Sequence, residues 1–520
     1  PGASLRVAGR DFDAAHGALD SPLLAPVEIV PVIGRQLRSL QALSGAAALV
    51  SNVGSDAIAQ AHSILDAPHS DSLDRLSTLR TLSRLATVTD RRLARIDTGP
   101  SVALIGPLAA RHGAFERDLA TLRARLQRAA ATTTTVADIL QGPQRYLLLM
   151  ANNAEMRAGS GSFLSIGVLD GGNGTLHLSD VQPTGGLTLP PAGVPVSADL
   201  QRLWGWARPG ADARNLGLTP QFDVNGPLAA GMWQASTGQQ VDGVLAVDVL
   251  AFQQILQVTG PVTLPDGTNV GAGNVVSLLT HDQYAGLSDT AGSVDTQARA
   301  DQLNTLAHSA LDALQAEPLD LRTLADAMTT IASGRHLLAW SARPQAQEAW
   351  EGAGVAGTIT ANTTMAAIVN RGGNKLDQYL SVDVTLKLVP RDGGTDAMMT
   401  FDLANRTPLG QSQYIAGPYP GIGTVYGEYR GLLALNLPAD ASIPTLASGR
   451  QPVAVGAEGP AWLISTEVDV LAGQNEQLVV HFRLPRHGSM TVAPSARLVP
   501  EVWDAAGVRF TDAAPATIRW

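Results

Sequence analysis

The sequence predicts a multidomain α+β protein with an N-terminal helical bundle over residues 1–140, an α/β sheet domain over 141–350 and a C-terminal antiparallel β-sandwich over 351–520. Three observations support this fold class. Apolar residues recur at three- and four-residue steps in the first zone, strand and helix patterns alternate in the second, and segments with period two fill the third. A chain of 520 residues is also too long for one hydrophobic core, so several domains are expected.

The first zone is predicted to form antiparallel helices. Segments 68–71 and 98–100 contain helix breakers and separate the helical stretches. One apolar stripe per helix is marked by leucines such as Leu73, Leu76, Leu79, Leu82 and Leu85. Charged residues alternate on the other faces, which is typical of a solvated bundle. The same pattern is compatible with a membrane-proximal stalk or with a surface for a membrane-protein partner.

The central zone alternates between strands and helices. The apolar runs 146–150 and 163–169 have the length and the flanking residues of buried strands. Turn residues 170–174 tolerate positive φ and lead into a returning strand, which predicts a hairpin. The next strand, 241–247, is followed by a helix over 249–258 that stops at a Gly-Pro pair.

The third zone loses the helical period and becomes rich in Thr, Val and Gly. Its strand-length segments alternate apolar and polar residues, and turn clusters separate them. They include 379–388, 398–403, 477–484 and 490–498. This pattern predicts an accessory β-sandwich.

Composition limits the classes of function. The net charge is 36 − 46 = −10, and Lys375 and Lys387 are the only two lysines. A general nucleic-acid binder is therefore not expected, because phosphate neutralisation needs clustered Lys and Arg. The chain has no cysteine, which excludes disulfides, thiolate metal sites and cysteine nucleophiles. That absence suits an oxidising exterior, and equally a genome that uses little cysteine.

The sequence also bears on the compartment. No run approaches the ~18–20 apolar residues of a transmembrane helix. Because the chain begins at Pro1 rather than at Met, we expect that a signal or anchor segment precedes it in the native protein. We therefore expect an extracytoplasmic protein that is anchored to a membrane through that segment.

Polar residues gather where the first buried strand ends. Asn152, Asn153, Glu155 and Arg157 follow its apolar run directly, and such strand ends are where α/β proteins place ligand sites. Arg157 suits a phosphate or carboxylate, and Glu155 suits a metal ion or the role of a base. The alternative is an internal Arg–Glu pair with Asn side chains that satisfy strand ends.

Two further sets are candidates. Aromatic faces beside Arg and Asp are typical of a groove for a sugar phosphate or an isoprenoid phosphate, and segment 183–226 supplies Trp204, Trp206, Arg208, Asp212, Arg214 and Asn215. A packed tryptophan loop with solvated charges is the alternative. The other set is Asp289, Asp295, Arg299 and Asp301, of which Asp295 could instead stabilise the positive end of its helix.

The stretch YLLLMANNAEMRAGSGSF, followed by VDGVLAVDVLAFQQILQVTGPV, resembles an uncharacterised family of actinobacterial envelope proteins, a domain of unknown function with the number 4012. The resemblance covers most of the chain. It includes the segment HLLAWSARPQAQEAW and the region from IVNRGGNKLDQYL onward. It implies a protein of the cell envelope.

The α/β zone is also similar to the LytR-CpsA-Psr family, through VDGVLAVDVLAFQQILQVTGPV and through Tyr284–Ala285 followed by Asp295, Arg299 and Gln302. Members of that family transfer glycopolymers from polyprenyl-pyrophosphate carriers onto peptidoglycan, with magnesium and clustered Arg and Asp residues. The resemblance implies a LytR-CpsA-Psr-like central sheet and Mg²⁺ as a cofactor. It also implies an envelope glycan or a polyprenyl-linked phosphate as the partner.

The first functional hypothesis is an enzyme that acts on a lipid-linked or wall-attached glycopolymer by phosphoryl transfer or by phosphodiester or pyrophosphate hydrolysis. Arg157, Arg214 and Arg299 would neutralise the phosphate, and Glu155 or Asp295 would serve as metal ligand or base. This hypothesis requires that Arg157, Glu155 and at least one of the other two arginines converge on one open groove.

The second hypothesis is a non-catalytic glycan- or partner-binding protein of envelope assembly. Gly286 and Leu287 stand where the LytR-CpsA-Psr family has arginines, and Asn152–Asn153 stand where it has an aspartate. A chain that keeps the fold but lacks these groups is expected to bind rather than to react. A glycoside hydrolase is a third option, which depends on the separation of two carboxylates in space.

Overall fold

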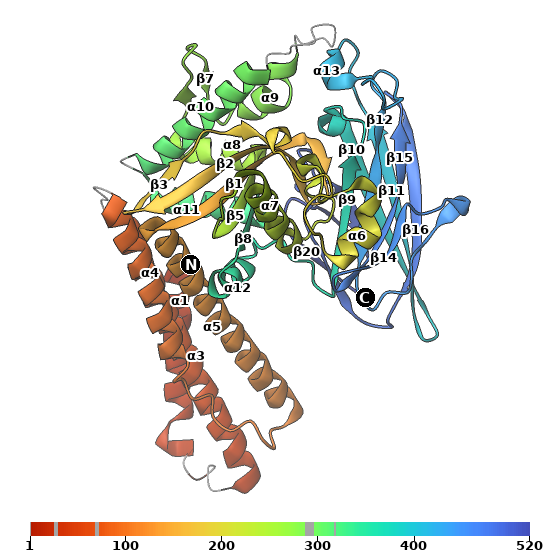
Figure 1. Cartoon of the computed structure of the whole chain (residues 1–520). Helices are drawn as coiled ribbons and strands as arrows, with labels where there is room; N and C mark the ends of the chain where they lie inside the picture. Colours follow the sequence, from red (N-terminus) through yellow and green to blue (C-terminus); the bar gives the residue numbers. More distant parts are fainter. Residues whose placement is uncertain (1, 25, 27–29, 68–71, 286–295, 317–318) are drawn as a thin grey trace. The chain divides into compact units, whose positions relative to one another are not determined.

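The computed structural model describes residues 2–24, 26, 30–67, 72–285, 296–316 and 319–520. These residues divide into two units, of which the first comprises residues 1–142 with 320–322 and the second comprises 143–319 with 323–520. The observed α+β class agrees with the sequence prediction, because helices fill the N-terminal part and strands dominate the C-terminal part (Figure 1).

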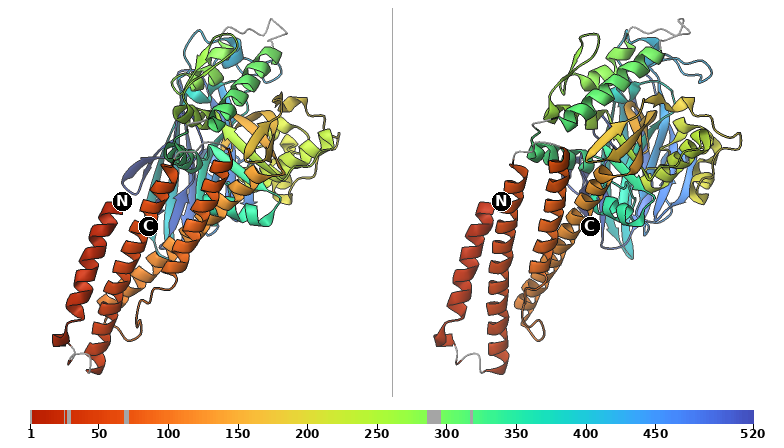
Figure 2. Two further views of the ribbon diagram at one scale, coloured as in Figure 1. Left: turned by 90° about the vertical axis from the view of Figure 1, so that its left-hand side faces the viewer. Right: turned by 60° about the vertical axis from the view of Figure 1, so that its left-hand side comes forward.

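The first unit is helical, as the leucine spacing predicts. Its helices are α1 (Gly2–Leu19), η1 (Pro22–Leu24), α3 (Pro31–Leu65), α4 (Ser72–Leu93) and α5 (Gly106–Gln141). The long helices run side by side, α1 along α3 and α4 along α5 (Figure 2). A proline occupies the first turn of both α3 and α5, where a missing backbone N–H costs nothing. Among the described residues, no helix has both the length and the apolar character needed to cross a bilayer.

The second unit begins with a six-stranded mixed sheet in the order β3–β2–β1–β5–β8, with β4 paired to β2. Its strands are β1 (Gln144–Arg157), β2 (Ser160–Gly172), β3 (Thr175–Leu178), β4 (Gln182–Pro183), β5 (Gly243–Asp248) and β8 (Leu337–Ser341). The expected hairpin joins β2 to β3 through Asn173 and Gly174, which both have positive φ, as a two-residue turn of this kind requires. Strands β1 and β5 are parallel, so their carboxyl ends meet at one edge.

Helices and short connections surround this sheet. Helix α7 packs on β5 and β8, and α8 packs on β1 and β5. The predicted helix after β5 is α8, which Asp248 caps by accepting hydrogen bonds from two backbone N–H groups. The elements are α6 (Ala198–Trp204), η2 (Thr184–Gly186), η3 (Gly205–Ala207), η4 (Ala213–Asn215), α7 (Phe222–Thr237), α8 (Val249–Thr259), β6 (Val262–Thr263), β7 (Asn269–Val270), α9 (Val275–Thr280), η5 (Asp282–Tyr284), α10 (Thr296–Gln315), α11 (Leu321–Ser333) and α12 (Pro344–Ala353).

The last third of the chain forms two six-stranded sheets that pack face to face. One has the order β14–β15–β12–β9–β17–β20 and the other β13–β16–β11–β10–β18–β19. Their elements are β9 (Thr363–Asn370), η7 (Leu376–Tyr379), β10 (Leu380–Arg391), β11 (Gly394–Asn405), α13 (Gln413–Ala416), β12 (Tyr429–Leu437), β13 (Thr445–Leu446), η8 (Ala447–Gly449), β14 (Ala454–Glu458), β15 (Ala461–Val470), β16 (Asn475–Leu484), β17 (Ser489–Val492), β18 (Val502–Ala505), β19 (Val508–Thr511) and β20 (Ala516–Arg519).

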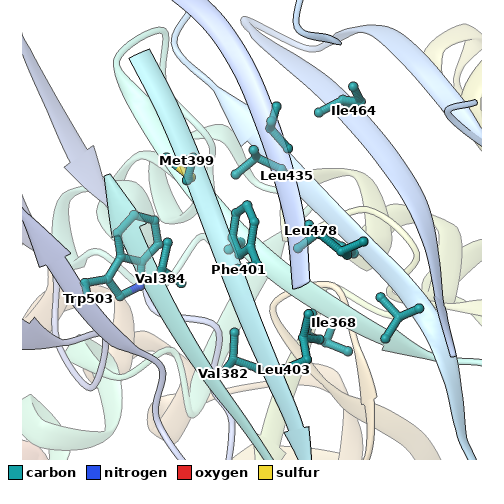
Figure 3. Close-up of a cluster of buried hydrophobic side chains, with 14 of the residues drawn as sticks. Ile368, Val382, Val384, Met399, Phe401, Leu403, Leu435, Ile464, Leu478 and Trp503 are labelled. Carbon is teal, nitrogen blue, oxygen red and sulfur yellow. The ribbon is translucent and has the colours of Figure 1, made fainter. Parts of the chain in front are cut away.

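Two pairings in this sandwich are parallel, β9 with β17 and β10 with β18, so the expected antiparallel pattern holds only for the others. A period of two assigns side chains to faces but carries no information on strand direction. The core between the two sheets contains Ile368, Phe401 and Trp503 (Figure 3). All eight residues of β9 are buried. Ile368 faces this core, whereas Val369 faces a second core that the sheet of β1 and β5 shares.

This shared core explains why the expected boundary at residue 350 falls inside one unit. The sheet that contains β9 and β12 is covered on both faces, by its sandwich partner and by the α/β layer. A strand covered on both faces is apolar along its whole length. The residues that join the two layers are therefore fixed relative to one another, and this positions the candidate site.

Candidate functional site

A pocket with a volume of about 290 Å³ lies where β1 ends against the segments that follow β9 and α13. One part of its wall is apolar and the other carries polar and aromatic side chains. Its apolar wall includes Leu164, Phe252 and Leu303. Its polar wall consists of Asn152, Glu155, Gln283, Tyr284, Lys375, Tyr414 and Tyr419.

An irregularity in β1 directs its polar residues toward this pocket. The pairing of β1 with β2 loses register between Asn152 and Met156, as in a β-bulge, which bends a strand and redirects its side chains. Gly161 of β2 lies directly against this bend. A Cβ at Gly161 would sit 2.4 Å from the backbone of Asn152, so only glycine allows this approach. Glu155, inside the irregular stretch, lines the pocket.

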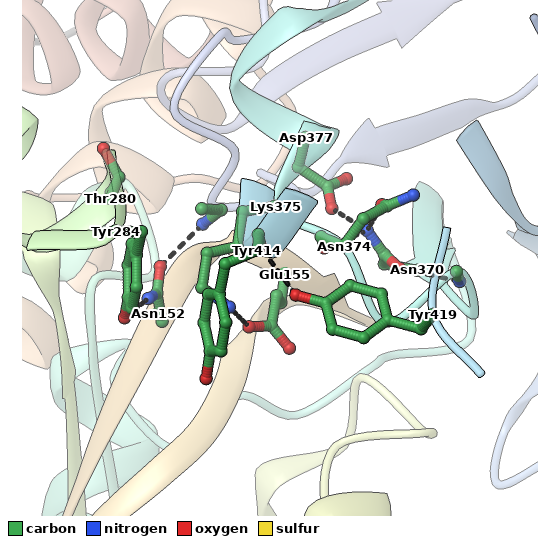
Figure 4. A network of polar contacts seen from close by, with 12 residues as sticks. Asn152, Glu155, Thr280, Tyr284, Asn370, Asn374, Lys375, Asp377, Tyr414 and Tyr419 are labelled. Carbon is green, nitrogen blue, oxygen red and sulfur yellow. Dashed lines mark hydrogen bonds and ion pairs between the residues drawn. The ribbon is translucent and has the colours of Figure 1, made fainter. Parts of the chain in front are cut away.

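Glu155 forms an ion pair with Lys375, whose Nζ donates to Oε1 of the carboxylate (Figure 4). Both side chains are largely buried, with exposures of 4% for Lys375 and 13% for Glu155. The Lys375 ammonium also lies 4.5 Å from the ring centre of Tyr284 and 4.7 Å from that of Tyr414. Burial alone would lower the pKa of Lys375, but the Glu155 carboxylate and the neighbouring Tyr284, Tyr419 and Tyr414 together raise it above its usual value. Lys375 therefore stays charged at neutral pH.

The three tyrosines come from two parts of the chain and form one aromatic wall. The rings of Tyr284 and Tyr414 are stacked with centroids 5.3 Å apart, and Tyr419 meets Tyr414 edge-on at 6.1 Å. The hydroxyl of Tyr419 donates to the backbone carbonyl of Tyr414. The wall thus presents flat apolar faces beside a buried cation, an arrangement worth up to about 2 kcal/mol per desolvated cation–ring contact.

A second buried ion pair lies two residues further along, between Asp377 and Arg497, with Oδ1 and Nη1 3.4 Å apart. Asp377 also accepts hydrogen bonds from the Tyr429 hydroxyl at 2.8 Å, from Asn370 Nδ2 at 2.9 Å and from the Met156 backbone N–H at 3.0 Å. Burial raises the pKa of Asp377 despite these partners. This network fastens the end of β1 to the sandwich and so holds Lys375 in place.

The predicted ligand residues Asn152 and Asn153 have different positions. Asn152 lines the pocket, and its Nδ2 donates to the Tyr284 hydroxyl at 3.2 Å and to the Leu279 carbonyl at 3.3 Å. Asn153 is fully buried, and its Nδ2 donates to Asp248 and to the Ala496 carbonyl, both at 2.8 Å. Asn152 can therefore orient the tyrosine wall, whereas Asn153 secures the start of α8.

Arg157 does not line this pocket. Its guanidinium donates to the backbone carbonyls of Met156 and Asn370 at 3.1 Å and of Arg214 at 3.2 Å. The Arg214 side chain is exposed and pairs with Asp212 at 2.7 Å. The phosphotransfer hypothesis requires Glu155 and Arg157 to converge with Arg214 or Arg299. The hydrogen bonds and ion pairs of Glu155, Arg157 and Arg214 show no such convergence.

The other predicted residues lie elsewhere or cannot be placed. Trp206 is 48% exposed, and the Arg371 guanidinium lies 4.5 Å over its ring. Arg208 is exposed and donates to the Pro191 carbonyl at 3.1 Å. Asp289 and Asp295 lie outside the residues that the structure describes, and so does the side chain of Arg299.

The donors at the end of β1 do not fit the magnesium ion that the resemblance implies. The Oδ1 atoms of Asn152 and Asn153 accept backbone N–H groups of Ala154 and Val249, and Glu155 is neutralised by Lys375. Mg²⁺ is usually held by one or two carboxylates in octahedral geometry. Over the described ranges, no group of three or more His, Cys, Asp or Glu side chains is arranged to hold a metal ion.

The lysine and the tyrosines of the pocket escaped the sequence analysis as site residues. They are Lys375, Tyr414, Tyr419 and, apart from the family resemblance, Tyr284. One signal was available, because Lys375 is one of only two lysines in the chain. A lysine that is buried is expected to have a specific partner. Nothing local, however, indicated that the partner is Glu155, which lies 220 residues away.

Comparison with known proteins identifies one segment. Residues 141–284 match the family model described as "Protein of unknown function (DUF4012)". No curated protein and no solved structure matches the chain. The matched segment supplies Asn152, Glu155 and Tyr284, whereas Lys375 and Tyr414 come from the sandwich beyond it. The pocket is therefore built jointly by the matched segment and by later parts of the chain, the sandwich among them.

Proposed function

We propose that this chain is a cell-envelope protein that binds a glycopolymer, with a sugar residue held in the tyrosine-walled pocket. The observation that carries the proposal is the buried Lys375–Glu155 pair set among Tyr284, Tyr414 and Tyr419. The location in the cell envelope rests on sequence resemblance. Residues in the matched segment, and residues around it, resemble those of envelope proteins.

The chemistry of the pocket suits a neutral, hydroxyl-rich ligand. The ammonium of Lys375 and the carboxylate of Glu155 offset each other's charge, so the pocket exerts little net attraction on a pyrophosphate. A sugar hydroxyl, in contrast, can donate to the carboxylate and accept from the ammonium at the same time. The tyrosine rings offer flat surfaces for the apolar face of a sugar ring.

The size of the pocket supports a short part of a polymer. Its volume of about 290 Å³ lies at the lower end of the roughly 300–1,000 Å³ that ligand pockets occupy. The apolar side, with Leu164, Phe252 and Leu303, can additionally cover the less polar part of a bound unit. A few convergent polar groups in a mostly apolar cleft are the usual composition of a binding site.

The contacts favour a protein that binds the glycopolymer over an enzyme that transfers it. Phosphoryl transfer is catalysed by positive groups aimed at the phosphate. Arg157 instead donates to three backbone carbonyls, and Arg214 is paired with Asp212. Neither guanidinium lines the pocket.

The test is binding of neutral tetrasaccharides of galactose, mannose, glucose and arabinose, measured by titration calorimetry on the full chain. We expect one of them to bind, and Tyr419→Ala to weaken binding by about tenfold or more, which corresponds to ~1.4 kcal/mol. The matched control is Tyr426→Ala, because Tyr426 belongs to the same segment and does not line the pocket.

Two results would overturn the proposal. One is the absence of binding to every tetrasaccharide in the panel. The other is an equal loss of binding in Tyr419→Ala and Tyr426→Ala, which would place the ligand elsewhere. Cleavage of the P–O–P bond of a polyprenyl-pyrophosphate-linked sugar by the wild type, seen as release of polyprenyl phosphate and a sugar phosphate and abolished in Arg157→Ala, would favour the transfer enzyme instead.

A further inference from the structure

An exposed aromatic and cationic surface lies beside the pocket. Trp206 is 48% exposed, and its ring packs against that of Trp204 with centroids 6.4 Å apart. Trp204 is fully buried, and its Nε1 donates to Glu458 at 3.1 Å. On Trp206 lies the guanidinium of Arg371, 4.5 Å from the ring centre. The exposed ring and its arginine therefore rest on an anchored base.

Arg371 is the cation of this surface that is best disposed to meet a ligand. It is exposed, and in the described part of the chain no ion pair joins it to a carboxylate. Its backbone N–H is fixed by the Arg430 carbonyl at 2.9 Å. When an arginine stacks on an aromatic ring, the N–H donors at the edge of its planar guanidinium stay available. Two of these donors can bind the two oxygens of a carboxylate or a phosphate together.

The local charge opposes that of the whole protein. Arg371 lies over the Trp206 ring, Arg208 follows Trp206 by two residues, and Arg157 bonds to the carbonyls of Asn370 and Arg214, whose own side chain is paired with Asp212. The chain as a whole carries a net charge of −10. A local concentration of positive charge raises the local concentration of anions. Arg208 also has φ of 52°, an uncommon conformation for a residue other than glycine and one that clusters at binding sites.

Two short stretches of chain connect this surface to residues of the pocket. Arg371 is followed by Gly373 and Lys375, which line the pocket, so at most about 14 Å separates the Cα atoms of Arg371 and Lys375. Glu155 of the pocket is likewise two residues from Arg157. Arg157 bonds to the carbonyl of Asn370, directly before Arg371, and so fixes the distance between the two places.

We propose that the Trp206–Arg371 surface is a subsite for an anionic group on the same glycan, a carboxylate or a phosphate, so that the ligand class is an anionic glycopolymer. This inference rests on the proposed function of the pocket and deepens it. The pocket receives a neutral sugar residue, and the neighbouring acidic group of the chain meets the edge of Arg371 while its sugar ring lies near Trp206.

The experiment uses pairs of probes in which one member carries an acidic group that the other lacks. One pair is galactotetraose with tetragalacturonate, and the other is mannotetraose with its 6-phosphorylated form. The full chain is labelled with 5-fluorotryptophan at its eight tryptophans, and the ¹⁹F signal of Trp206 is the one that Trp206→Phe lacks. Affinities of the wild type, Arg371→Gln and the control Arg509→Gln are measured for each probe. Arg509 is an exposed arginine elsewhere in the same unit.

We expect the charged member of at least one pair to bind about tenfold more tightly than its neutral partner and to shift the Trp206 signal. Which pair responds distinguishes a carboxylate from a phosphate. Arg371→Gln should remove this advantage and leave binding of the neutral probe unchanged, while Arg509→Gln should change neither. Arg371→Lys, which keeps the charge but not the planar fork, should restore only part of the advantage.

The failure of this inference differs from the failure of the proposed function. If charged and neutral probes bind equally and the Trp206 signal does not move, the subsite is wrong, whereas the proposed function holds as long as neutral binding depends on Tyr419. If no probe binds in a manner that depends on Tyr419, the proposed function itself is wrong. An advantage of the charged probe that persists in Arg371→Gln also overturns the subsite, because the anion then binds elsewhere.

Discussion

Two buried ion pairs lie two residues apart on one segment and differ in their surroundings. Asp377 and Arg497 are each only 1% exposed, and Asp377 is enclosed by hydrogen bonds from Tyr429, Asn370 and the backbone of Met156. Lys375 has one carboxylate partner, Glu155, and otherwise faces aromatic rings at the wall of a pocket. The first pair is satisfied by the protein alone, whereas the second has capacity left for a ligand.

The comparison separates a structural from a functional use of buried charge. A buried ion pair offers little net stability, but removing one partner is costly because the other stays buried without compensation. Around Asp377, separating the two partners would be costly in free energy, and this keeps the sheet of β1 attached to the sandwich. Around Lys375 the same physics keeps a largely buried cation and carboxylate at the wall of a pocket, where each can interact strongly with a polar ligand.

The largest expected effect is that of Asp377→Ala. We expect a loss of about 3–5 kcal/mol in the free energy of unfolding, because Arg497 would remain buried without its partner. Urea unfolding followed by tryptophan fluorescence measures it, since all eight tryptophans belong to the second unit. The control is Asp469→Ala, which breaks a half-exposed pair with Arg430 and should cost about 1 kcal/mol or less. Similar losses in the two variants would contradict the structural role of Asp377.

An intermediate effect on stability is expected for Lys375→Met. The lost hydrogen bond to a charged group is worth about 1.5–3 kcal/mol, and Glu155 can regain hydration through the pocket. We therefore expect a smaller loss of unfolding free energy than in Asp377→Ala, together with a loss of tetrasaccharide binding that Asp469→Ala does not show. If Lys375→Met were as destabilising as Asp377→Ala, or left binding intact, the distinction between the two pairs would fail.

The smallest effect concerns a third buried pair, whose cation depends on pH. His336 Nδ1 lies 2.7 Å from Asp248 Oδ2. Burial alone would lower the pKa of His336, but the Asp248 carboxylate outweighs it, with a contribution from Asp512, so that the pKa lies above 6.5. A cation with a raised pKa stabilises the fold fully below the unfolded value of about 6.5, and this stability is lost as pH rises through the folded pKa.

The wild type should therefore lose unfolding free energy as pH rises from about 6.5 through the folded pKa of His336, by ~1.4 kcal/mol for each unit by which the pKa is raised. His336→Gln should lack this part of the pH dependence in the same fluorescence measurement. Should both proteins show the same dependence over this range, the His336–Asp248 pair would not be its source. With the expected result, the His336–Asp248 pair would differ from the other two pairs, because its cation is charged only in part of the pH range.

The candidate site was accessible to sequence reasoning only in part. Asn152 and Glu155 were singled out because they are polar residues at a strand end, and both line the pocket. Arg157 satisfied the same criterion, yet its guanidinium donates to backbone carbonyls instead. Residue type and position along a strand do not reveal which backbone groups from distant segments need a donor.

By itself, the sequence determined the elements that depend on near neighbours. The leucine period predicted the helices of the first unit, residue types at Asn173 and Gly174 predicted the hairpin turn, and a Gly-Pro pair marked the end of α8. The tertiary structure alone decided that the α/β layer shares a core with the sandwich. It also decided that Glu155 meets Lys375 and that Arg371 covers Trp206. The physical reason is that a period of two or 3.6 assigns side chains to faces, whereas only packing determines which distant segment covers each face.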